Sequence, residues 1–124
     1  MNIGWDFDHT LTRSPHKFFE FIKATSVIGV QHFLITGRRT QDKLTTLKEL
    51  EAIHSNFSKL FSQIYFYPSD YQVDKVTVDL LKQIAYWKAQ ICLDIPIHTI
   101  FEDSVFIIEA VKRVSPDTIV GLLI

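Results

Sequence analysis

Short apolar runs alternate along the chain with longer stretches whose apolar residues recur at helical spacing. The short runs are rich in β-branched and aromatic residues and are bounded by polar or turn-forming residues, which predicts β-strands. We place the predicted strands at Asn2–Asp6, Gln31–Thr36, Gln63–Tyr67, Ile97–Phe101 and Thr118–Ile124.

The longer stretches predict helices between these strands. Apolar residues return at the period of an amphipathic helix from Leu44 to Ile53 and again from Val76 to Ile91. Alternation of strands and helices implies an α/β fold in which parallel strands are joined by right-handed crossovers. The predicted helices lie near Pro15–Thr25, Thr40–Ser55, Val73–Leu93 and Ser104–Val114, with Ser104 as an N-cap.

Polar and charged residues follow most of the predicted strands. In an open parallel sheet, ligands bind outside the carboxyl ends of the strands, so these positions are the first candidates for a functional site. The segments concerned are Asp6-Phe7-Asp8-His9-Thr10, Thr36-Gly37-Arg38-Arg39, Pro68-Ser69-Asp70-Tyr71 and Glu102-Asp103-Ser104.

The acidic residues at these strand ends predict a cation site. Asp6 and Asp8 are two positions apart, so in an extended segment both side chains project to the same side. Carboxylates that close repel each other unless a cation lies between them. Glu102 and Asp103 would bring further negative charge to the same edge, with no compensating basic cluster expected beside them. Such a set of oxygen ligands favours Mg2+.

With a cation in place, these residue types can carry out phosphoryl transfer. An Asp carboxylate can attack phosphorus and form an aspartyl-phosphate. A second carboxyl group two residues later can protonate the leaving group and then activate water. A Thr hydroxyl and a Lys ammonium can bind the phosphoryl oxygens. The candidates for these last roles are Thr36 and one of Lys75, Lys82 and Lys88.

The order of these motifs resembles that of the haloacid dehalogenase-like hydrolase superfamily. Its first motif, Asp-x-Asp-x-Thr after an apolar strand, is matched by Asp6-Phe7-Asp8-His9-Thr10. Its second motif, a strand that ends in Thr or Ser, is matched by Phe33-Leu34-Ile35-Thr36. The third, a Lys ahead of the last motif, is matched by Lys88, and the fourth, an acidic pair, by Glu102-Asp103. The resemblance covers nearly the whole chain, and all motifs are in order.

The resemblance implies a role for each matched residue. Asp6 would be the nucleophile and a Mg2+ ligand. Asp8 would be the general acid/base and would offer its backbone carbonyl to the metal. Asp103, with or without Glu102, would complete the metal shell. The phosphate would be bound by Thr36, Gly37 and Lys88.

The resemblance also implies a single domain over residues 1–124, with a three-layer, doubly wound, Rossmann-like sheet of five parallel strands. Only one predicted helix separates Thr10 from the second strand, and the stretch after Tyr67 is equally short. Neither has room for the cap domain that members of this family often carry. An open site of this kind would accept a nucleotide, a nucleic-acid end or another bulky phosphorylated substrate, unless a second subunit closes it.

Two details depart from the commonest form of the family. The acidic pair is Glu-Asp instead of Asp-Asp, which leaves open which member contacts the metal, and we favour Asp103. Lys88 lies in the middle of one long predicted helix and not at a helix start. Either the helix breaks near Ala85–Trp87 or another lysine serves, with Lys82 as the reserve candidate.

Arg38 and Arg39 follow Thr36 at the open edge of the predicted sheet. They could contact a substrate phosphate or the leaving group. They could equally be a pair of surface cations that lead into the next helix. Both interpretations stay open at this point.

Composition narrows the classes of function. The chain has 124 residues, of which 47% are hydrophobic, enough for the core of one domain. Its formal net charge of −1 does not resemble that of a general polyanion binder. A single cysteine, Cys92, excludes an intramolecular disulfide and a site built from several thiolates. We see no secretory leader and no run that could span a bilayer, so we expect a cytoplasmic protein without a membrane partner.

Two other functions use similar residues. A signalling receiver domain also combines Asp, Thr, Lys and an acidic pair, but there the acidic pair comes first in the chain and no residue corresponds to Asp8. A catalytically silent binding or regulatory module that keeps the fold is the alternative to an enzyme. The apolar last strand, with no covering helix after it, makes a homodimer a further expectation.

Overall fold

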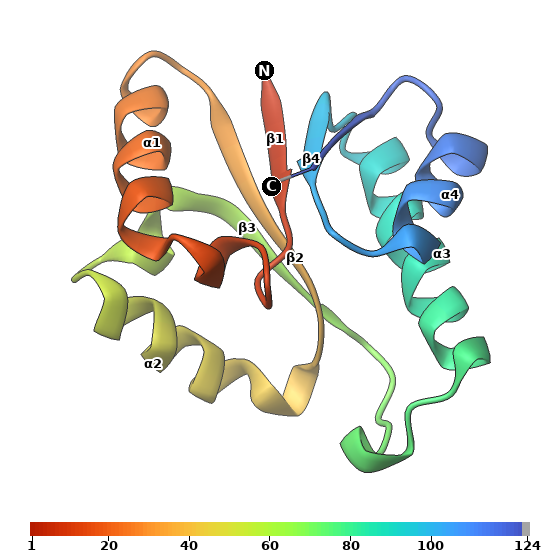
Figure 1. Ribbon diagram of the computed structural model, residues 1–124. Coiled ribbons are helices and arrows are strands. Elements are labelled where there is room, and N and C mark those ends of the chain that lie inside the picture. Colours follow the sequence, from red (N-terminus) through yellow and green to blue (C-terminus); the bar gives the residue numbers. More distant parts are fainter. Residues whose placement is uncertain (123–124) are drawn as a thin grey trace.

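The computed structural model describes residues 1–122, which form a five-stranded sheet in which neighbouring strands are parallel (Figure 1). The strand order is β3-β2-β1-β4-β5, so β1 is the central strand. The α/β fold and the parallel pairing that the sequence predicts are therefore confirmed. The strands are β1 (Asn2–Trp5), β2 (Gln31–Arg39), β3 (Phe61–Tyr67), β4 (Thr99–Phe101) and β5 (Ile119–Gly121).

Helices cover both faces of this sheet. They are α1 (Pro15–Val27), α2 (Lys43–Ile53), α3 (Val78–Asp94) and α4 (Val105–Val114), with short 3-10 turns η1 (Leu11–Arg13), η2 (Thr40–Asp42), η3 (Phe57–Leu60) and η4 (Val73–Lys75). In Figure 1, α1 and α2 lie on one side of the sheet, and α3 and α4 lie on the other. The arrangement is compatible with a Rossmann-like layout. Within residues 1–122, no helix is both long enough and apolar enough to cross a lipid bilayer.

The second strand is longer than the sequence predicts. It continues through Arg39 instead of ending at Thr36. Thr36 and Arg39 pair with two consecutive residues of β3, so Gly37 and Arg38 form a bulge between them. A bulge bends and twists the strand that carries it, and this one lies where β2 reaches the candidate site.

Two predicted helices begin later than expected. Thr77 caps α3, because its hydroxyl oxygen accepts a hydrogen bond from the backbone N–H of Leu80 at 3.2 Å. The helix therefore starts at Val78, and the residues from Val73 to Lys75 form the separate turn η4. The predicted helix at Thr40–Ser55 is likewise divided into η2 and α2.

The carboxyl-terminal part also differs in detail from the prediction. Only Ile119–Gly121 pairs as β5, and the predicted strand residues Leu123 and Ile124 lie outside the described part of the chain. Ser104 precedes α4 as predicted, but its hydroxyl makes no capping hydrogen bond. Its backbone carbonyl accepts hydrogen bonds from the first turn of α4 instead.

The core consists of two apolar clusters, one on each face of the sheet. Along β2 the side chains alternate: Leu34 belongs to the cluster beneath α1 and α2, whereas Phe33 and Ile35 belong to the cluster beneath α3 and α4. A strand buried on both faces reads as a continuous apolar run. This explains why the run from Phe33 to Ile35 shows no alternation in the sequence.

Gly4 allows β1 to fit closely against the α3 side of the sheet. A Cβ atom at this position would lie 3.3 Å from side-chain atoms of both Ile100 and Ile35, tighter than most contacts of its kind. Because side chains alternate along a strand, Asp6 lies on the same side as Gly4. The strand therefore directs Asp6 toward α3.

A buried chain of hydrogen bonds joins β1, β2 and α1. Trp5 Nε1 donates to His32 Nδ1 at 2.9 Å, and His32 Nε2 lies 2.7 Å from Thr25 Oγ1. Since Nδ1 accepts from Trp5, the imidazole proton is on Nε2 and is donated to Thr25, whose own hydroxyl donates to Phe21 O. Every donor has an acceptor only while His32 is neutral. Burial lowers the pKa of His32 to about 4.

We predict that titration of His32 makes folding stability depend on pH. As the pH falls, His32 of the unfolded chain is protonated around its ordinary pKa of 6.5. In the folded protein it is protonated only around its lowered pKa of about 4. The stabilisation is therefore fully present above pH 6.5 and is lost progressively as the pH falls toward 4. The loss is about 2–3 kcal/mol in the free energy of unfolding, measured by urea denaturation at a series of pH values.

The variant His32→Gln provides the comparison, because a glutamine does not titrate in this range. Its free energy of unfolding should fall less than that of the wild type between pH 6.5 and 4. His16→Gln, which replaces an exposed histidine of α1, is the matched control and should keep the wild-type pH dependence. Parallel pH profiles for His32→Gln and the wild type would contradict the prediction.

Candidate functional site

The candidate site lies at the carboxyl ends of the two central strands, β1 and β4. From β1 the chain proceeds to β2 and β3 on one side, and β4 then pairs with the other side of β1. This reversal leaves a crevice between the loops that follow the two strands. Asp6 follows β1 and Glu102 follows β4, and the backbone N–H of Asp6 donates to Phe101 O at 3.1 Å. Both acidic residues line a cleft of about 250 Å³.

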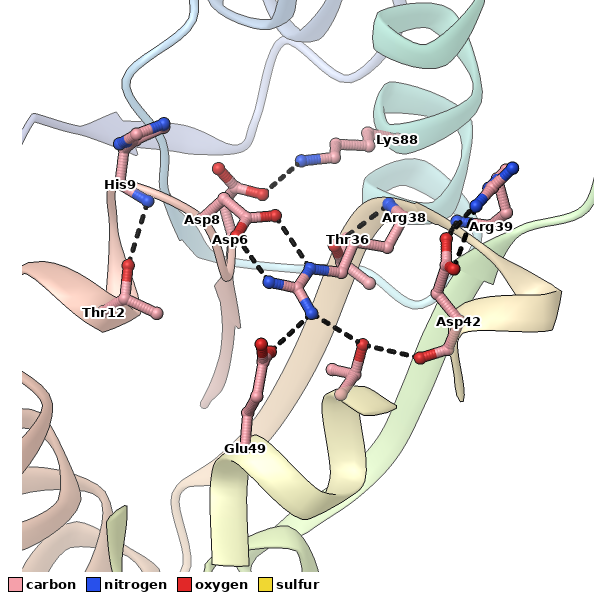
Figure 2. Close-up of polar contacts among 11 residues, drawn as sticks. Asp6, Asp8, His9, Thr12, Thr36, Arg38, Arg39, Asp42, Glu49 and Lys88 are labelled. Atoms are coloured by element: carbon pink, nitrogen blue, oxygen red, sulfur yellow. Dashed lines mark hydrogen bonds and ion pairs between the residues drawn. The ribbon is translucent and has the colours of Figure 1, made fainter. Parts of the chain in front are cut away.

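A buried lysine from α3 joins these two carboxylates. Lys88 Nζ lies 2.7 Å from Asp6 Oδ1 and 3.0 Å from Glu102 Oε2. The Lys88 side chain is 2% exposed, and those of Asp6 and Glu102 are 12% and 1% exposed. Figure 2 shows the Lys88 side chain crossing from α3 toward Asp6. The three groups therefore form a nearly dry ion triad.

The structure decides one of the alternatives that the sequence left open. The helix does not break near Ala85–Trp87: α3 is continuous from Val78 to Asp94, and Lys88 reaches the cleft from its middle. Lys88 shares the buried face of the helix with Ala85 and Ala89, whose small side chains leave room for its stem. Lys82 is exposed and does not line the cleft.

The triad also shifts the proton affinities of its members. Burial by itself lowers the pKa of Lys88, but the charges of Asp6 and Glu102 outweigh it, and the net shift is upward. Lys88 therefore stays an ammonium throughout the neutral range. Burial raises the pKa of Glu102, and the Lys88 charge acts in the opposite direction. Burial outweighs it, and the pKa of Glu102 is about 7.

One cation was expected between Asp6 and Asp8. The two carboxylates instead have different partners, because the segment between them is not extended. β1 ends at Trp5, and the chain turns at once through residues 7–10. His9 has a positive φ of 61°, in the left-handed region, and its N–H donates to Thr12 Oγ1 at 3.1 Å. The turn sends Asp8 away from Lys88 and toward β2 (Figure 2).

Arg38, in the bulge of β2, holds the Asp8 carboxylate with two parallel hydrogen bonds. Its Nε lies 2.9 Å from Asp8 Oδ2, and its Nη2 lies 2.7 Å from Asp8 Oδ1. Its Nη1 binds Thr46 and Glu49 of α2, and the guanidinium lies 4.6 Å from the centre of the Phe7 ring. The hydrogen bond to Asp8 is the main cause that raises the pKa of Arg38.

The expectation of carboxylates without compensating cations is therefore wrong. Lys88 neutralises charge at Asp6 and Glu102, and Arg38 does so at Asp8. The local pattern does not predict these ion pairs, because both cations come from elements that lie far from Asp6 and Asp8 along the chain. Each reaches the sheet edge only through the fold.

The two arginines have different surroundings. Arg38 lines the cleft, but Arg39 does not. Arg39 binds Asp42 through Nε at 2.9 Å and donates from Nη1 to the backbone carbonyl of Tyr71, also at 2.9 Å. Each arginine is held by a carboxylate, Arg38 by Asp8 and Arg39 by Asp42.

Thr36 and Gly37 lie next to the cleft on β2. Thr36 is 1% exposed, and its Oγ1 accepts a hydrogen bond from the backbone N–H of Arg38 at 3.1 Å. Within the described chain, the Thr36 hydroxyl donates to no protein group and its proton is available. Gly37 lines the cleft, and its carbonyl accepts from the Tyr71 hydroxyl at 2.8 Å.

Three carboxylates are close enough to share a metal ion. One oxygen from each of Asp6, Glu102 and Asp103 lies within 4.8 Å of the others. This all-oxygen donor set suits Mg2+, which takes one or two carboxylates and fills the rest of its shell with water or phosphate. Both oxygens of Glu102 already accept hydrogen bonds, from Lys88 Nζ and from the backbone N–H of Asp103. Asp6 and Asp103 are therefore the better ligands, and the Asp8 side chain is outside this cluster.

Sequence reasoning missed two residues at this site: Thr46 and Glu49. Thr46 and Glu49 are three positions apart on α2, so they share a helix face, but nothing in the pattern indicates that this face meets β2. Tyr71 was one of several aromatic residues near the third strand, and only the fold separates it from the others.

Comparisons with known proteins add no relatives to this picture. No protein-family model matches the chain, no curated protein matches it, and no solved structure matches it.

We predict that Lys88→Met destabilises the fold by about 3–5 kcal/mol, because it leaves two buried carboxylates without their cation. Urea unfolding at neutral pH, with EDTA present so that no metal replaces the ammonium, measures the change. Lys82→Met makes the same substitution at an exposed position of the same helix and should change stability by less than about 0.5 kcal/mol. Equal effects of the two substitutions would show that the triad is not a buried charge system.

Proposed function

We propose that the protein is a Mg2+-dependent phosphomonoesterase that works through an aspartyl-phosphate on Asp6. The observation that carries the proposal is the triad in which Lys88 Nζ lies 2.7 Å from Asp6 Oδ1 and 3.0 Å from Glu102 Oε2. The triad lies in a cleft at the carboxyl ends of the central strands, where ligands of such sheets bind.

A purely structural role explains this triad less well. Removing charged groups from water costs several kcal/mol per ion, and apolar residues of similar volume are often as stabilising as a buried ion pair. A buried ammonium that faces a cleft is, in contrast, suited to bind an anion. Two of the three ammonium hydrogens of Lys88 are used by Asp6 and Glu102, which leaves the third for a phosphoryl oxygen.

In the first step, a carboxylate oxygen of Asp6 attacks phosphorus while the bond from phosphorus to the leaving oxygen breaks. The electron pair of that bond goes to the leaving oxygen, which takes a proton from the carboxylic acid form of Asp8. The products of this step are an alcohol and an aspartyl-phosphate on Asp6. One Asp8 oxygen must be released from Arg38 before it can carry the proton.

In the second step, the Asp8 carboxylate accepts a proton from a water molecule that attacks the phosphorus. The bond between phosphorus and the Asp6 oxygen breaks, and the electron pair returns to the Asp6 carboxylate. Inorganic phosphate leaves, and both aspartates are restored. No oxidant or further reactant is needed.

The phosphoryl group would be held by Lys88, by the Thr36 hydroxyl and by backbone groups near Gly37. Thr36 suits this role because its oxygen already accepts from Arg38 N, so its proton is free to be donated. When bound by Asp6 and Asp103, with the Asp8 backbone carbonyl as a further ligand, Mg2+ would offset the negative charge of the phosphate.

We further propose that the fold is a doubly wound, haloacid dehalogenase-like core without a cap. The strand order and the helices on both faces support this assignment. Between β1 and β2 the described chain forms only η1 and α1, and between β3 and α3 only η4, so neither connection contains an inserted domain. The resemblance of the four motifs remains the main support.

The second candidate function is a catalytically silent binding module with the same fold. One observation favours it: both carboxylate oxygens of Asp8 accept hydrogen bonds from Arg38. An Asp8 side chain that stayed in this bidentate pair could not exchange protons with substrate. The enzyme requires that pair to open when substrate binds, and the module does not.

We predict that the protein hydrolyses an aryl phosphate in the presence of Mg2+, and that EDTA abolishes the reaction. Asp6→Asn should lower kcat/KM by at least about a thousandfold, because an amide cannot attack phosphorus. Release of inorganic phosphate measures the rate. Asp117→Asn, which makes the same change at an exposed turn residue, is the control and should retain wild-type activity.

The same assay separates the candidates. Activity that survives Asp6→Asn would rule out Asp6 as the nucleophile. Mg2+ binding without hydrolysis of any phosphomonoester would favour the silent module.

We also predict that Asp103, and not Glu102, is the metal ligand of the acidic pair. Asp103→Asn should weaken Mg2+ binding, measured by calorimetry without substrate, by at least about tenfold, since it removes a charged oxygen ligand. Asp117→Asn again serves as the control. Wild-type affinity in Asp103→Asn would transfer the role to Glu102.

A further inference from the structure

The cleft has two chemically different walls. One wall carries the charged groups that follow β1, lie on β2 and follow β4, together with Lys88 of α3. The other wall is apolar and is built by the segment after β3 and the amino-terminal part of α3, together with one residue of α4. It comprises Tyr71, Val76, Leu81, Ile84 and Ile107.

Part of this apolar wall is accessible and has no assigned partner. Val76 and Leu81 are 43% and 38% exposed, whereas Ile84 and Ile107 are buried beneath them. The apolar surface therefore continues from the core up to the mouth of the cleft. A ligand that reached the triad would lie against Val76 and Leu81.

Tyr71 lines the cleft with its hydroxyl already engaged by the protein. The hydroxyl donates to Gly37 O at 2.8 Å, and the Tyr71 carbonyl accepts from Arg39 Nη1 at 2.9 Å. Burial raises the pKa of the Tyr71 hydroxyl, so it remains a neutral donor to Gly37. The residue is thus fixed at both ends, and its hydroxyl cannot donate to a ligand without giving up the bond to Gly37 O.

The charged groups of the cleft leave no surplus of positive charge for a second phosphate. Four carboxylates line the cleft, Asp6, Asp8, Glu102 and Asp103, against two cations, Lys88 and Arg38. Lys88 is held by two carboxylates, and Arg38 is held by Asp8 and Glu49. Among the described residues that line the cleft there is no third Lys or Arg. A second phosphate on the ligand would find carboxylates and no cation to bind it.

We infer that the substrate is the monophosphate ester of a small, uncharged, apolar or aromatic alcohol, whose leaving group lies against Tyr71, Val76 and Leu81. This inference rests on the proposed phosphomonoesterase function and names the substrate class of the same site. It disfavours nucleic-acid ends and polyphosphates, although the open cleft has room for them.

The test compares ligands that differ in polarity and not in size. Pentyl phosphate and glycerol phosphate have leaving groups with the same number of non-hydrogen atoms, and kcat/KM is measured for both with Mg2+. A phosphorylated oligonucleotide end is a third substrate. Hexylphosphonate and dihydroxybutylphosphonate, which cannot be hydrolysed, provide the same comparison as dissociation constants from calorimetry.

We expect pentyl phosphate to exceed glycerol phosphate in kcat/KM, and hexylphosphonate to bind more tightly than its diol counterpart, each by about tenfold. Leu81→Asn should reduce both ratios to about two or less, because it replaces the apolar contact with an amide. Leu93→Asn makes the same change on the same helix at an exposed position outside the cleft and should leave both ratios unchanged.

The outcomes separate the two proposals. Three results would overturn the substrate class while the phosphatase stands. The first is equal kcat/KM for pentyl phosphate and glycerol phosphate in the wild type, and the second is a preference for glycerol phosphate or the oligonucleotide. The third is a pentyl-to-glycerol ratio in Leu81→Asn that equals that of the wild type. Absence of hydrolysis with a retained, Leu81-dependent preference for hexylphosphonate would overturn the phosphatase and keep an apolar phosphoryl-ligand site. Absence of hydrolysis together with absence of a preference for hexylphosphonate would overturn both proposals.

Discussion

Burial of the Lys88 ammonium between Asp6 and Glu102 is the interaction on which the arrangement of this site depends. It joins α3 to the ends of β1 and β4 at distances of 2.7 and 3.0 Å. A charge this well buried is tolerable only while both carboxylates remain in place. The neighbouring sequence serves the same requirement: Ala85 and Ala89 leave space beside the lysine, and Gly4 lets β1 approach the α3 side closely.

A second cation, Arg38, holds the other acidic residue of the first motif on the β2 side of the site. Arg38 links Asp8 to Thr46 and Glu49 of α2. The turn at His9 is what allows two aspartates only two positions apart to bind cations on different elements, Lys88 of α3 and Arg38 of β2. The site is therefore tied to α2 on one face and to α3 on the other, and a disturbance of either helix reaches the acidic residues directly.

The sequence predicted the architecture and the identity of the acidic residues better than their partners. Parallel strands bring their carboxyl ends to one edge, so Asp6 and Glu102 could be placed at the same edge from their positions after predicted strands. Lys88 could be nominated only through the family resemblance, since its position mid-helix argued against it. A lysine in register with Ala85, Ala89 and Cys92 on an apolar face must find a buried partner, and that was the signal available. The roles of Arg38 and Tyr71 depend on a bulge and a loop whose geometry no local pattern reveals.

The hydrogen bond from Tyr71 to Gly37 O has a consequence for how this site can evolve. The bond ends on a backbone carbonyl, so the placement of the Tyr71 end of the apolar wall relative to β2 does not depend on which side chains line the wall. Substitutions at Val76 and Leu81 can therefore alter the shape and polarity of the wall while its anchor stays in place. The polarity of this wall and the positions of the acidic residues are thus separable traits in this fold, and selection can change the first without rebuilding the second.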